Sequence, residues 1–424
     1  MAKKRRNPNE TRIVITGLGA ITPIGNNVQD FWDNLLKGKN GIRTIQNFNT
    51  DEISIKFAGE VDFDRFHEYM PKKMLPKLGR FIFLSQVASI QAFKDSGIQP
   101  EDVEKDPTNY GAIIGTGDGG SDIHVRNIRN SLETLNWDGV SPFYVVGLIA
   151  NAAAGYFAKS TNFQGPNFSV SSACATSNHA IITAANLIKM GYADVIISGG
   201  TESTLNFAGL SAFNAIYALS RRNDSPETAS RPFDKDRDGF VMGEGAGILC
   251  LEELEHAKKR GAKIYAEITG LGISCDAYDI VVPHPEGRGA MLAMKNAMED
   301  AELNPEDIDV INAHGTSTIL GDLSETSAIR KAFGKAADNI LVHSTKSMIG
   351  HLIGAAGGTE AVASVQTILK NVVHPSINIF EQDPRIDLKI AANKPYEKKV
   401  TNVLSNSFGF GGQNSSIIIS RFKG

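Results

Sequence analysis

The sequence predicts an α/β fold in which two similar halves form one compact unit. Short apolar runs bounded by glycine alternate with longer segments of helical periodicity along the chain, which favours α/β architecture with largely buried sheets. The order of these elements repeats between the two halves. The 424 residues exceed what one simple core usually holds, yet no low-complexity or linker-like tract divides them.

The first half contains five predicted strands and an Ala-rich helix. The strands are short apolar runs at residues 12–16, 111–115, 167–170, 195–198 and 247–251. The helix is expected at residues 177–191, directly after a turn that contains serine and cysteine. A basic tail is expected at residues 1–10, where residues 3–6 are all cationic and should be solvated. The first half then covers residues 11–260.

The second half, residues 261–424, repeats this order. Its strands are expected at residues 266–270, 310–313, 340–343, 403–406 and 416–420, and its helices at 287–301 and 359–371. Residues 168–190 run from a strand through a turn into a helix. Residues 341–370 do the same, through Ser344, Lys346 and the small residues 354–358. Two such halves would place the ends of equivalent strands together, so that one cleft collects residues from both.

Composition excludes several classes of protein. The formal net charge of −4 argues against a nucleic-acid-binding protein, which usually carries a broad basic excess. No apolar stretch is long enough to cross a bilayer. Three scattered cysteines do not make a disulfide framework, which fits a reducing cytoplasm. Cys250 lies in an apolar run and is expected in the core. Cys275 has no evident role, whereas Cys174 has a distinctive setting.

Cys174 stands in VSSACATSN, residues 170–178, where a strand gives way to a helix. A thiol at a helix N-terminus is expected to have a lowered pKa, because free N–H groups and the helix dipole favour the thiolate. The thiolate is the form that attacks acyl carbon. Its small neighbours would leave room for an acyl chain. A single cysteine in such a turn is nevertheless more often structural than catalytic.

Three further segments contain residues suited to catalysis. NAHGTST (312–318) places His314 at the end of an apolar strand, and STKSMIGHLIG (344–354) brings Lys346 and His351 together before a helix of small residues. NSFGFGGQN (406–414) is a glycine-rich turn, which on its own suggests only a flexible hairpin. Each histidine alone would more often be a hydrogen-bonded core residue.

Together these four segments closely resemble the signature blocks of β-ketoacyl-acyl-carrier-protein synthases, nearest to the elongating type II enzyme. The resemblance runs from about residue 12 to the C-terminus and includes VITGLG (14–19) and SRPFDKDRDGFVMGEG (230–245). It implies the thiolase-like fold, with duplicated halves in a five-layered αβαβα arrangement. It also implies a homodimer that acts on acyl chains carried by an acyl carrier protein.

The resemblance also implies roles for individual residues. Cys174 would accept the acyl group, while His314 and His351 stabilise the enolate formed when malonyl-acyl carrier protein loses carbon dioxide. The remaining implied site residues are Lys346 with its partner acid Glu360, Phe408 as gate and backbone donor beside Cys174, Thr316 and Thr318 on the pantetheine arm, Phe213 and Asp118 beside the substrate, and Lys72, Lys73, Lys77 and Arg80 for carrier docking. No metal and no cofactor beyond the carrier's phosphopantetheine is implied.

Several positions depart from the family pattern. Asp118 stands where an apolar residue or glycine is usual, and a carboxylate beside an alkyl chain is costly unless it is paired. Val281 and Val282 replace polar residues that would touch pantetheine, and Tyr217 replaces an arginine near the carrier entrance. These departures predict a shorter, polar or unsaturated acyl chain in place of a long saturated one.

The sequence also bears on four other interpretations. GTGDGG (115–120) fits a dinucleotide-binding string, but residues 131–136, where an acidic strand end should follow, do not form a buried strand pattern. Cys174, His314 and His351 could bind zinc, although the usual ligand spacings are missing. A biosynthetic thiolase would carry a second cysteine in its C-terminal block, and residues 406–414 have none. A non-catalytic, chain-length-setting subunit of a ketosynthase heterodimer would lack the nucleophilic cysteine.

Overall fold

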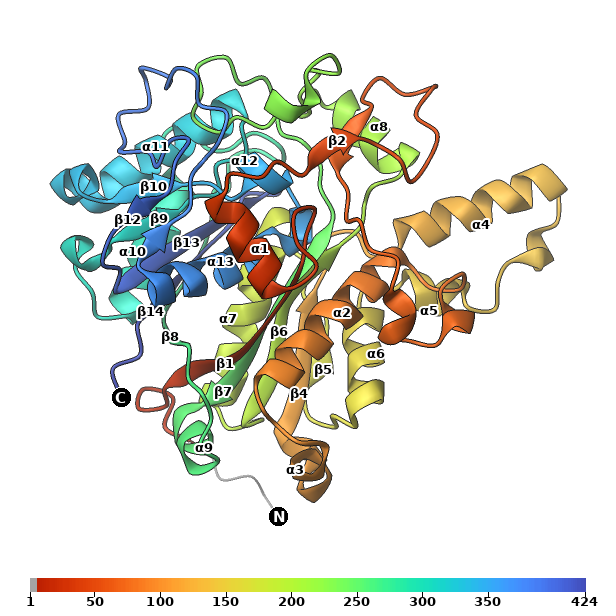
Figure 1. Ribbon diagram of the computed structural model, residues 1–424, viewed down its shortest axis with the longest axis horizontal. Coiled ribbons are helices and arrows are strands. Elements are labelled where there is room, and N and C mark those ends of the chain that lie inside the picture. The colour runs from red at the N-terminus through yellow and green to blue at the C-terminus, as the bar shows by residue number, and fades with distance from the viewer. Residues whose placement is uncertain (1–5) are drawn as a thin grey trace.

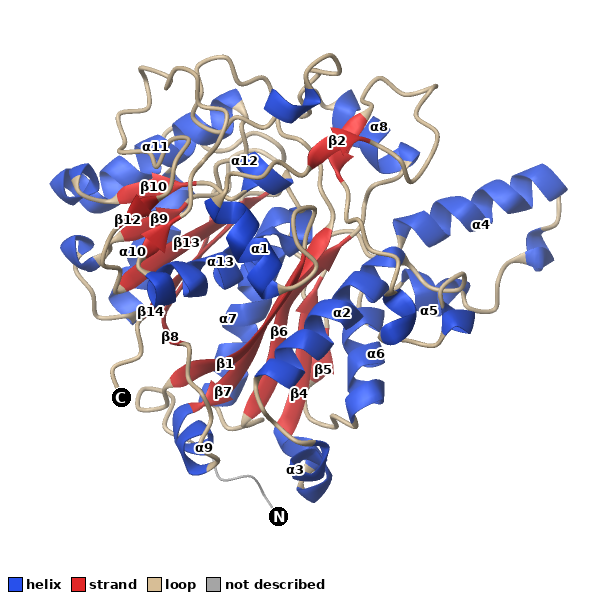
Figure 2. Ribbon diagram, viewed as in Figure 1, coloured by secondary structure: helices blue, strands red, loops and turns tan. Residues whose placement is uncertain are grey.

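The computed structural model describes residues 6–424, which contain a ten-stranded mixed sheet flanked by helices (Figures 1 and 2). All ten strands predicted from the sequence are confirmed, although most differ in length. Those of the first half are β1 (Ile13–Ile21), β4 (Tyr110–Gly115), β5 (Asn167–Phe168), β6 (Val195–Glu202) and β7 (Gly245–Glu253). Those of the second half are β8 (Ala266–Cys275), β9 (Val310–Asn312), β10 (Leu341–His343), β13 (Asn402–Gly409) and β14 (Gln413–Ser420).

The predicted duplication is visible in the strand order. The first half runs β5-β4-β6-β7-β1 and the second runs β10-β9-β13-β14-β8. Corresponding pairs also agree in direction: β4 with β6 and β9 with β13 are parallel, whereas β6 with β7 and β13 with β14 are antiparallel. The halves join where β1 pairs with β8 in antiparallel fashion. The two halves therefore repeat the same topology and are related to each other by a local two-fold relationship.

Helices complete a five-layered arrangement (Figure 2). The layers contain α2 (Arg80–Asp95) and α6 (Ala152–Thr161) outside the first half-sheet, α7 (Thr176–Lys189) and α13 (Ala356–Lys370) between the half-sheets, and α10 (Arg288–Asp300) and α11 (Ile319–Phe333) outside the second. The predicted helices correspond to α7, α10 and α13. This is the predicted five-layered α/β fold.

Small residues let the central helices lie close to the sheets. A Cβ atom on Gly358 of α13 would come within 2.2 Å of the Gly247 carbonyl oxygen in β7, and one on Gly247 would come within 2.1 Å of the Thr359 nitrogen. The Ala- and Gly-rich composition of this layer is therefore a packing requirement, since α7 and α13 are covered on both sides.

Two equivalent turns lead into the central helices. A 3₁₀ turn at Ala173–Ala175 precedes α7, and another at Ile353–Ala355 precedes α13. Each begins with a non-glycine residue in the left-handed region, Ala173 at φ 49° and Ile353 at φ 45°. Such conformations cost about 1 kcal/mol or more and persist where the surroundings enforce them.

The remaining helices and short strands decorate this core. They are α1 (Val28–Leu36), α3 (Pro100–Lys105), α4 (Ser121–Thr134), α5 (Tyr144–Leu148), α8 (Phe207–Ala215), α9 (Leu254–Lys259), α12 (Lys346–Ile349), β2 (Ile42–Thr44), β3 (Phe57–Gly59), β11 (Val372–Val373) and β12 (Tyr396–Glu397). Helix α4 extends away from the body of the molecule (Figure 1). Within residues 6–424, none of these helices combines the length and apolar character needed to cross a bilayer.

The predicted basic tail begins outside the described residues, which start at Arg6. The expectation that Arg6 is solvated is wrong. Its guanidinium forms an ion pair with Asp194 and donates to the carbonyls of Ile188 and Ala193 at 2.9 and 3.0 Å. These acceptors lie in the last turn of α7 and just after it, so Arg6 ties the start of the described chain to the end of a central helix.

Candidate active site

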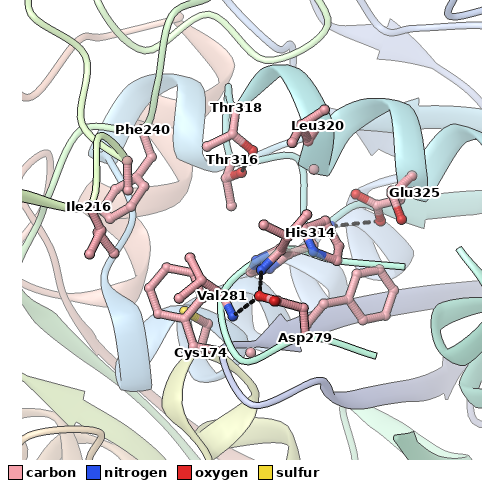
Figure 3. A pocket seen from close by; sticks show the side chains of 18 of the residues that line it. Cys174, Ile216, Phe240, Asp279, Val281, His314, Thr316, Thr318, Leu320 and Glu325 are labelled. Atoms are coloured by element: carbon pink, nitrogen blue, oxygen red, sulfur yellow. Dashed lines mark hydrogen bonds between the residues drawn. The ribbon is translucent and has the colours of Figure 1, made fainter. Parts of the chain in front are cut away.

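A cavity of about 330 Å³ lies between the two halves and is lined by residues of both. Cys174 comes from the turn before α7, His314 from the segment after β9, and His351 from the segment after α12. Figure 3 shows Cys174 and His314 facing this cavity, with Thr316 and Thr318 further along its wall. The predicted cleft at the ends of equivalent strands is therefore present.

Three side chains from distant parts of the chain converge there. The Cys174 sulfur and one ring nitrogen of each histidine lie within 4.8 Å of one another. The His314 and His351 rings meet edge to face, with centroids 5.2 Å apart at 84°. One small reacting group could therefore contact all three residues at once.

Cys174 is held where close packing leaves little freedom. A Cβ atom on Gly409, in the β13–β14 hairpin, would lie 2.6 Å from the Ser172 oxygen and 3.2 Å from the Cys174 nitrogen. Cys174 is only 6% exposed. The expectation of a lowered pKa is wrong: burial raises the pKa of the Cys174 thiol to about 12, despite the opposing charge of Lys346 and hydrogen bonds from the Phe410 and Cys174 N–H groups. The resting residue is a thiol.

Both histidines are neutral at physiological pH. Burial, followed by the charge of Lys346, holds the pKa of His314 and of His351 well below the ordinary value. In His351, Nδ1 accepts the Ile353 N–H at 3.3 Å, which leaves the proton on Nε2. That Nε2 is buried without a protein partner. His351 therefore offers an unused N–H donor at the cavity.

Two buried carboxylates organise this region. Lys346 and Glu360 form an ion pair in which each side chain is only 1% exposed, as the resemblance implied. Glu325, which sequence reasoning missed, accepts the N–H groups of His314 and Gly315 at 2.9 and 2.8 Å and the Asn406 amide at 3.0 Å. Glu325 gives only a weak signal in the sequence. It is an acidic residue about three helical turns after His314, on the buried side of its helix.

The backbone donor beside Cys174 belongs to Phe410, not to Phe408. Phe408 lies within β13 opposite Asn414, whereas Phe410 begins the turn, and its N–H hydrogen-bonds the Cys174 sulfur. The Phe408 ring instead packs 5.7 Å from His314. Both phenylalanines line the cavity. The glycines on either side of Phe410 were the available signal, because they place it at the hairpin tip.

Other predicted substrate residues line the same cavity. The Thr316 and Thr318 hydroxyls are 2.9 Å apart, and Phe213 packs against the ring of Phe410 with centroids 6.2 Å apart. Among the departing residues, Tyr217, Val281 and Val282 also line this cavity.

Asp118 does not line this cavity and belongs to a separate acidic cluster. It is exposed in part to solvent, and desolvation of its carboxyl raises its pKa against hydrogen bonds from Ser121 and Thr204. Its N–H faces Glu202, whose pKa is raised to about 7 by burial and by the charge of Asp118. Glu202 accepts the N–H groups of Gly117 and Gly354 at 2.8 and 3.0 Å. The cluster therefore lies beside the two turns that precede the central helices.

The predicted docking cations are not equivalent. Lys72 and Lys73 are exposed, and Lys77 lies over the Phe143 ring at 4.5 Å. Arg80 differs from the predicted docking role. Its guanidinium donates to the fully buried Glu244 at 2.7 and 2.8 Å and to the Val61 carbonyl. Arg80 therefore belongs to a structural ion pair and not to the docking cluster.

By distance alone, Cys174, His314 and His351 could also hold a metal ion. The electrostatic setting opposes this, because the Lys346 ammonium acts on all three groups and N–H donors already face the sulfur. A cation would be repelled by Lys346 and would displace those donors.

Comparison with known proteins agrees with this geometry. Residues 10–257 match the model of the β-ketoacyl synthase N-terminal domain, and residues 265–380 that of its C-terminal domain. The chain is 45% identical over 418 residues to a 3-oxoacyl-[acyl-carrier-protein] synthase 2 from Synechocystis, covering 98% of this chain and 100% of that protein.

Solved structures show the same relationship. The ishigamide ketosynthase/chain length factor superposes with a TM-score of 0.91 at 31% identity, covering 99% of this chain and 100% of that one. A type II polyketide ketosynthase, bound to the hexaketide and in complex with its acyl-carrier protein, gives a TM-score of 0.89 at 30% identity, with coverage of 99% and 100%. The chain, with its duplicated fold and its shared cysteine–histidine cavity, belongs to the β-ketoacyl synthase family.

Proposed function

We propose that the protein catalyses the decarboxylating Claisen condensation of a Cys174-bound acyl group with malonyl-acyl carrier protein to give 3-oxoacyl-acyl carrier protein. The observation that carries this proposal is the convergence of the Cys174 sulfur and two neutral histidines on one cavity. The similarity to 3-oxoacyl-[acyl-carrier-protein] synthases over the whole chain supports it. Fatty-acid synthesis or a related polyketide or polyene pathway would use this reaction.

The first step transfers the acyl group to the enzyme. The Cys174 thiol attacks the thioester carbonyl of the acyl carrier, and its proton leaves with the pantetheine thiol. The N–H groups of Cys174 and Phe410 already face the sulfur and can hold the oxyanion of the tetrahedral intermediate. Phe410, at the hairpin tip beside Phe213, takes over the gating role that the resemblance had implied for Phe408.

The second step forms the carbon–carbon bond. The malonyl carboxylate leaves as carbon dioxide, and its electron pair passes into an enolate whose oxygen accepts N–H donors of His314 and His351. The enolate carbon attacks the Cys174 thioester, and Cys174 leaves and regains a proton. Neutral histidines suit this role because they donate without protonating the carbanion. Each such donor is typically worth about 3 kcal/mol of transition-state stabilisation.

Lys346 and Glu360 support these groups without contacting the reacting carbon. The Lys346 charge contributes to the low pKa of both histidines, so it keeps them neutral. Its pairing with Glu360 compensates the cost of burying that charge. Thr316 and Thr318 would hold the pantetheine arm. The carrier's phosphopantetheine supplies the only group transfer arm, and no metal or other cofactor takes part.

A homodimer and a cytoplasmic location complete the proposal. Residues 167–168 of β5 are exposed at the end of the sheet, and Leu135 and Trp137, which follow α4, are exposed apolar residues. A second copy could cover both features. Three free cysteines suit a reducing compartment. Light scattering of the purified protein tests the dimer, and a monomeric mass would contradict it.

The acyl chain is proposed to be short, polar or unsaturated. Asp118 and the buried Glu202 form an acidic cluster beside the turn that holds Cys174, and a saturated chain that extends from Cys174 to this cluster would meet carboxylates at a cost in free energy. Competition among acyl carriers of different length and unsaturation tests this, with Asp118→Ile as the matched variant. A wild-type preference for long saturated chains would remove the idea.

Mass spectrometry of Cys174 tests the whole reaction. Incubation with an acylated carrier protein should transfer one acyl group to the peptide that contains Cys174. Malonyl-acyl carrier protein added afterwards should remove that group as a 3-oxoacyl product. An intact protein that never becomes acylated would instead favour the non-catalytic, chain-length-setting subunit of a heterodimer.

A further inference from the structure

A ring of exposed apolar side chains surrounds the mouth of the cavity. We call it the entrance collar, and it consists of Ile216, Tyr217, Ile280, Val281, Ile319 and Leu320. Their exposed fractions run from 39% for Val281 to 79% for Tyr217. They come from three segments: the turn after α8, the loop after β8, and the start of α11. Figure 3 shows Ile216, Val281 and Leu320 on different sides of the cavity.

Such convergence differs from the scattered apolar residues of an ordinary surface. Single exposed aliphatic residues need no explanation, but a contiguous set around a mouth marks a binding surface. Tyr217 adds a second sign, because it is a bulky residue in the left-handed region, at φ 57°, with its side chain exposed. The Arg221 guanidinium stands 5.2 Å from its ring centroid. The fold thus accepts backbone strain to present an aromatic ring to solvent.

Charges near the collar are largely engaged within the protein. Arg221 lies over Tyr217, and Arg222 pairs with Asp238 at 3.5 Å. The Asp279 carboxylate accepts the N–H groups of Val281 and Val282, each at 2.8 Å. The exposed lysines 72 and 73 belong to a different segment and do not line the mouth. The rim therefore offers mainly apolar area to a partner, with the Arg221 guanidinium and the Asp279 carboxylate as exposed charges.

The position of the collar specifies its occupant, a step that depends on the proposed function. Cys174 lies inside the cavity and is almost fully buried, so a substrate on a pantetheine arm must pass the collar to reach it. The protein that bears this arm then rests on the surface around the mouth. That protein would therefore cover the collar each time it delivers an acyl or malonyl group.

We propose that the entrance collar is the docking surface for the substrate-loaded carrier protein, and that it selects a carrier whose surface beside the phosphopantetheine attachment is aliphatic. Docking on the collar depends on desolvation of apolar side chains, with charge attraction as a minor contribution. Its strength is therefore nearly independent of salt, in contrast to docking on an exposed lysine cluster.

Two substrate forms separate docking from chemistry. The same acyl and malonyl groups are supplied on the carrier protein or as free pantetheine thioesters. The test variant is Tyr217→Asn with Ile280→Ser, since asparagine tolerates the left-handed conformation. We expect its KM for carrier-bound substrate to rise about 30-fold with kcat unchanged, a loss typical of removing interface anchors. Its kinetics with free thioesters should match wild type. Ile273→Ser, which removes an exposed apolar residue outside the cavity, is the control.

Defined outcomes overturn the proposal. An unchanged carrier KM in the double variant would do so, as would an equal rise in KM for both substrate forms. A salt-dependent carrier KM that responds to Lys72→Glu with Lys73→Glu, but not to the collar variant, would place docking on the lysines. Collar-dependent binding to phosphatidylglycerol vesicles, with carrier kinetics unaffected, would identify a lipid surface. Failure of wild type to condense even free thioesters would refute the proposed function, a result distinct from all of these.

Discussion

The N–H of Ile353 donates to Nδ1 of His351 at 3.3 Å, and this contact fixes which ring nitrogen of His351 carries its proton. Ile353 can do so because its left-handed conformation, φ 45°, turns the chain back toward His351. The neighbouring His314 is also neutral, since burial and the Lys346 charge lower its pKa. The cavity therefore contains uncharged imidazoles whose N–H groups can serve an enolate.

Replacing both histidines, His314→Ala with His351→Ala, should abolish malonyl decarboxylation. Removing one donor to a developing oxyanion typically costs about 100- to 1000-fold in rate, so the double variant should fall to background. Carbon dioxide release from labelled malonyl-acyl carrier protein measures this. The exposed His67→Ala is the control and should match wild type. Undiminished carbon dioxide release from the double variant would contradict the assigned role.

Cys174→Ala should abolish condensation while the fold survives. The change removes one sulfur atom from a small turn, with an expected stability loss below about 2 kcal/mol. Thermal unfolding and product formation together test this prediction. Cys275→Ala, which alters an exposed cysteine, should retain full activity. A Cys174→Ala protein that still elongated acyl chains would show that another group is the nucleophile.

The double variant Lys346→Met with Glu360→Gln should shift the pH profile. Removing the Lys346 charge raises the pKa of both histidines, whose low values it helps to maintain. Imidazolium would then form at a higher pH, so the acidic limb of the decarboxylation rate should move toward neutral pH. Changing both partners avoids an unpaired buried charge. An acidic limb at the wild-type position, in a folded variant, would exclude this influence of Lys346.

Glu202 should make the protein less stable as the pH rises through about 7. Its folded-state pKa is raised to about 7 from an ordinary 4.5, chiefly by burial, so the folded state binds more protons between these values. The associated stability is fully present below the unfolded pKa and is lost as the pH rises through the folded pKa, with a magnitude on the order of 2 kcal/mol. Denaturant unfolding at pH 5 and pH 8 should show a smaller difference for Glu202→Gln. An equal difference in both proteins would show that Glu202 does not titrate in this range.

Dialysis against a chelator should leave condensation unchanged. The Lys346 charge repels a cation from Cys174 and the histidines, and backbone N–H groups already donate hydrogen bonds to the sulfur. Activity should also be unaffected by added zinc at concentrations equal to that of the enzyme. Loss of activity on chelation, with recovery on adding zinc, would establish the metal-site interpretation of this trio.

The fold was predictable because its signals are local or repeated. Glycine-bounded apolar runs located all ten strands of the large sheet, and the two strand–turn–helix segments matched β5 with α7 and β10 with α13. The histidines and Lys346 were predictable only from the resemblance, since their meeting depends on chain segments far apart in sequence.

What the sequence missed depends on three-dimensional burial. The low thiol pKa expected from a helix terminus failed because desolvation of Cys174 outweighs the nearby donors. Arg80 resembled a free surface cation, but it forms an ion pair with the buried Glu244. Phe410 differs from Phe408 only in its place at the end of a ladder, a boundary that sequence patterns define poorly. Glu325 could not be recognised in the sequence, because its hydrogen-bond partner Asn406 is far from it along the chain.

The duplicated turns before α7 and α13 have unequal duties, and this limits redesign. Cys174 and Gly354 occupy the same position in the two copies, yet a Cβ atom at 354 would lie 2.4 Å from the Gly117 nitrogen and 2.6 Å from a Glu202 oxygen. Replacing Gly354 with cysteine would therefore not place a second reactive thiol at the equivalent position without moving its neighbours. The turn before α7 holds the reactive cysteine, and the turn before α13 supports it by close packing.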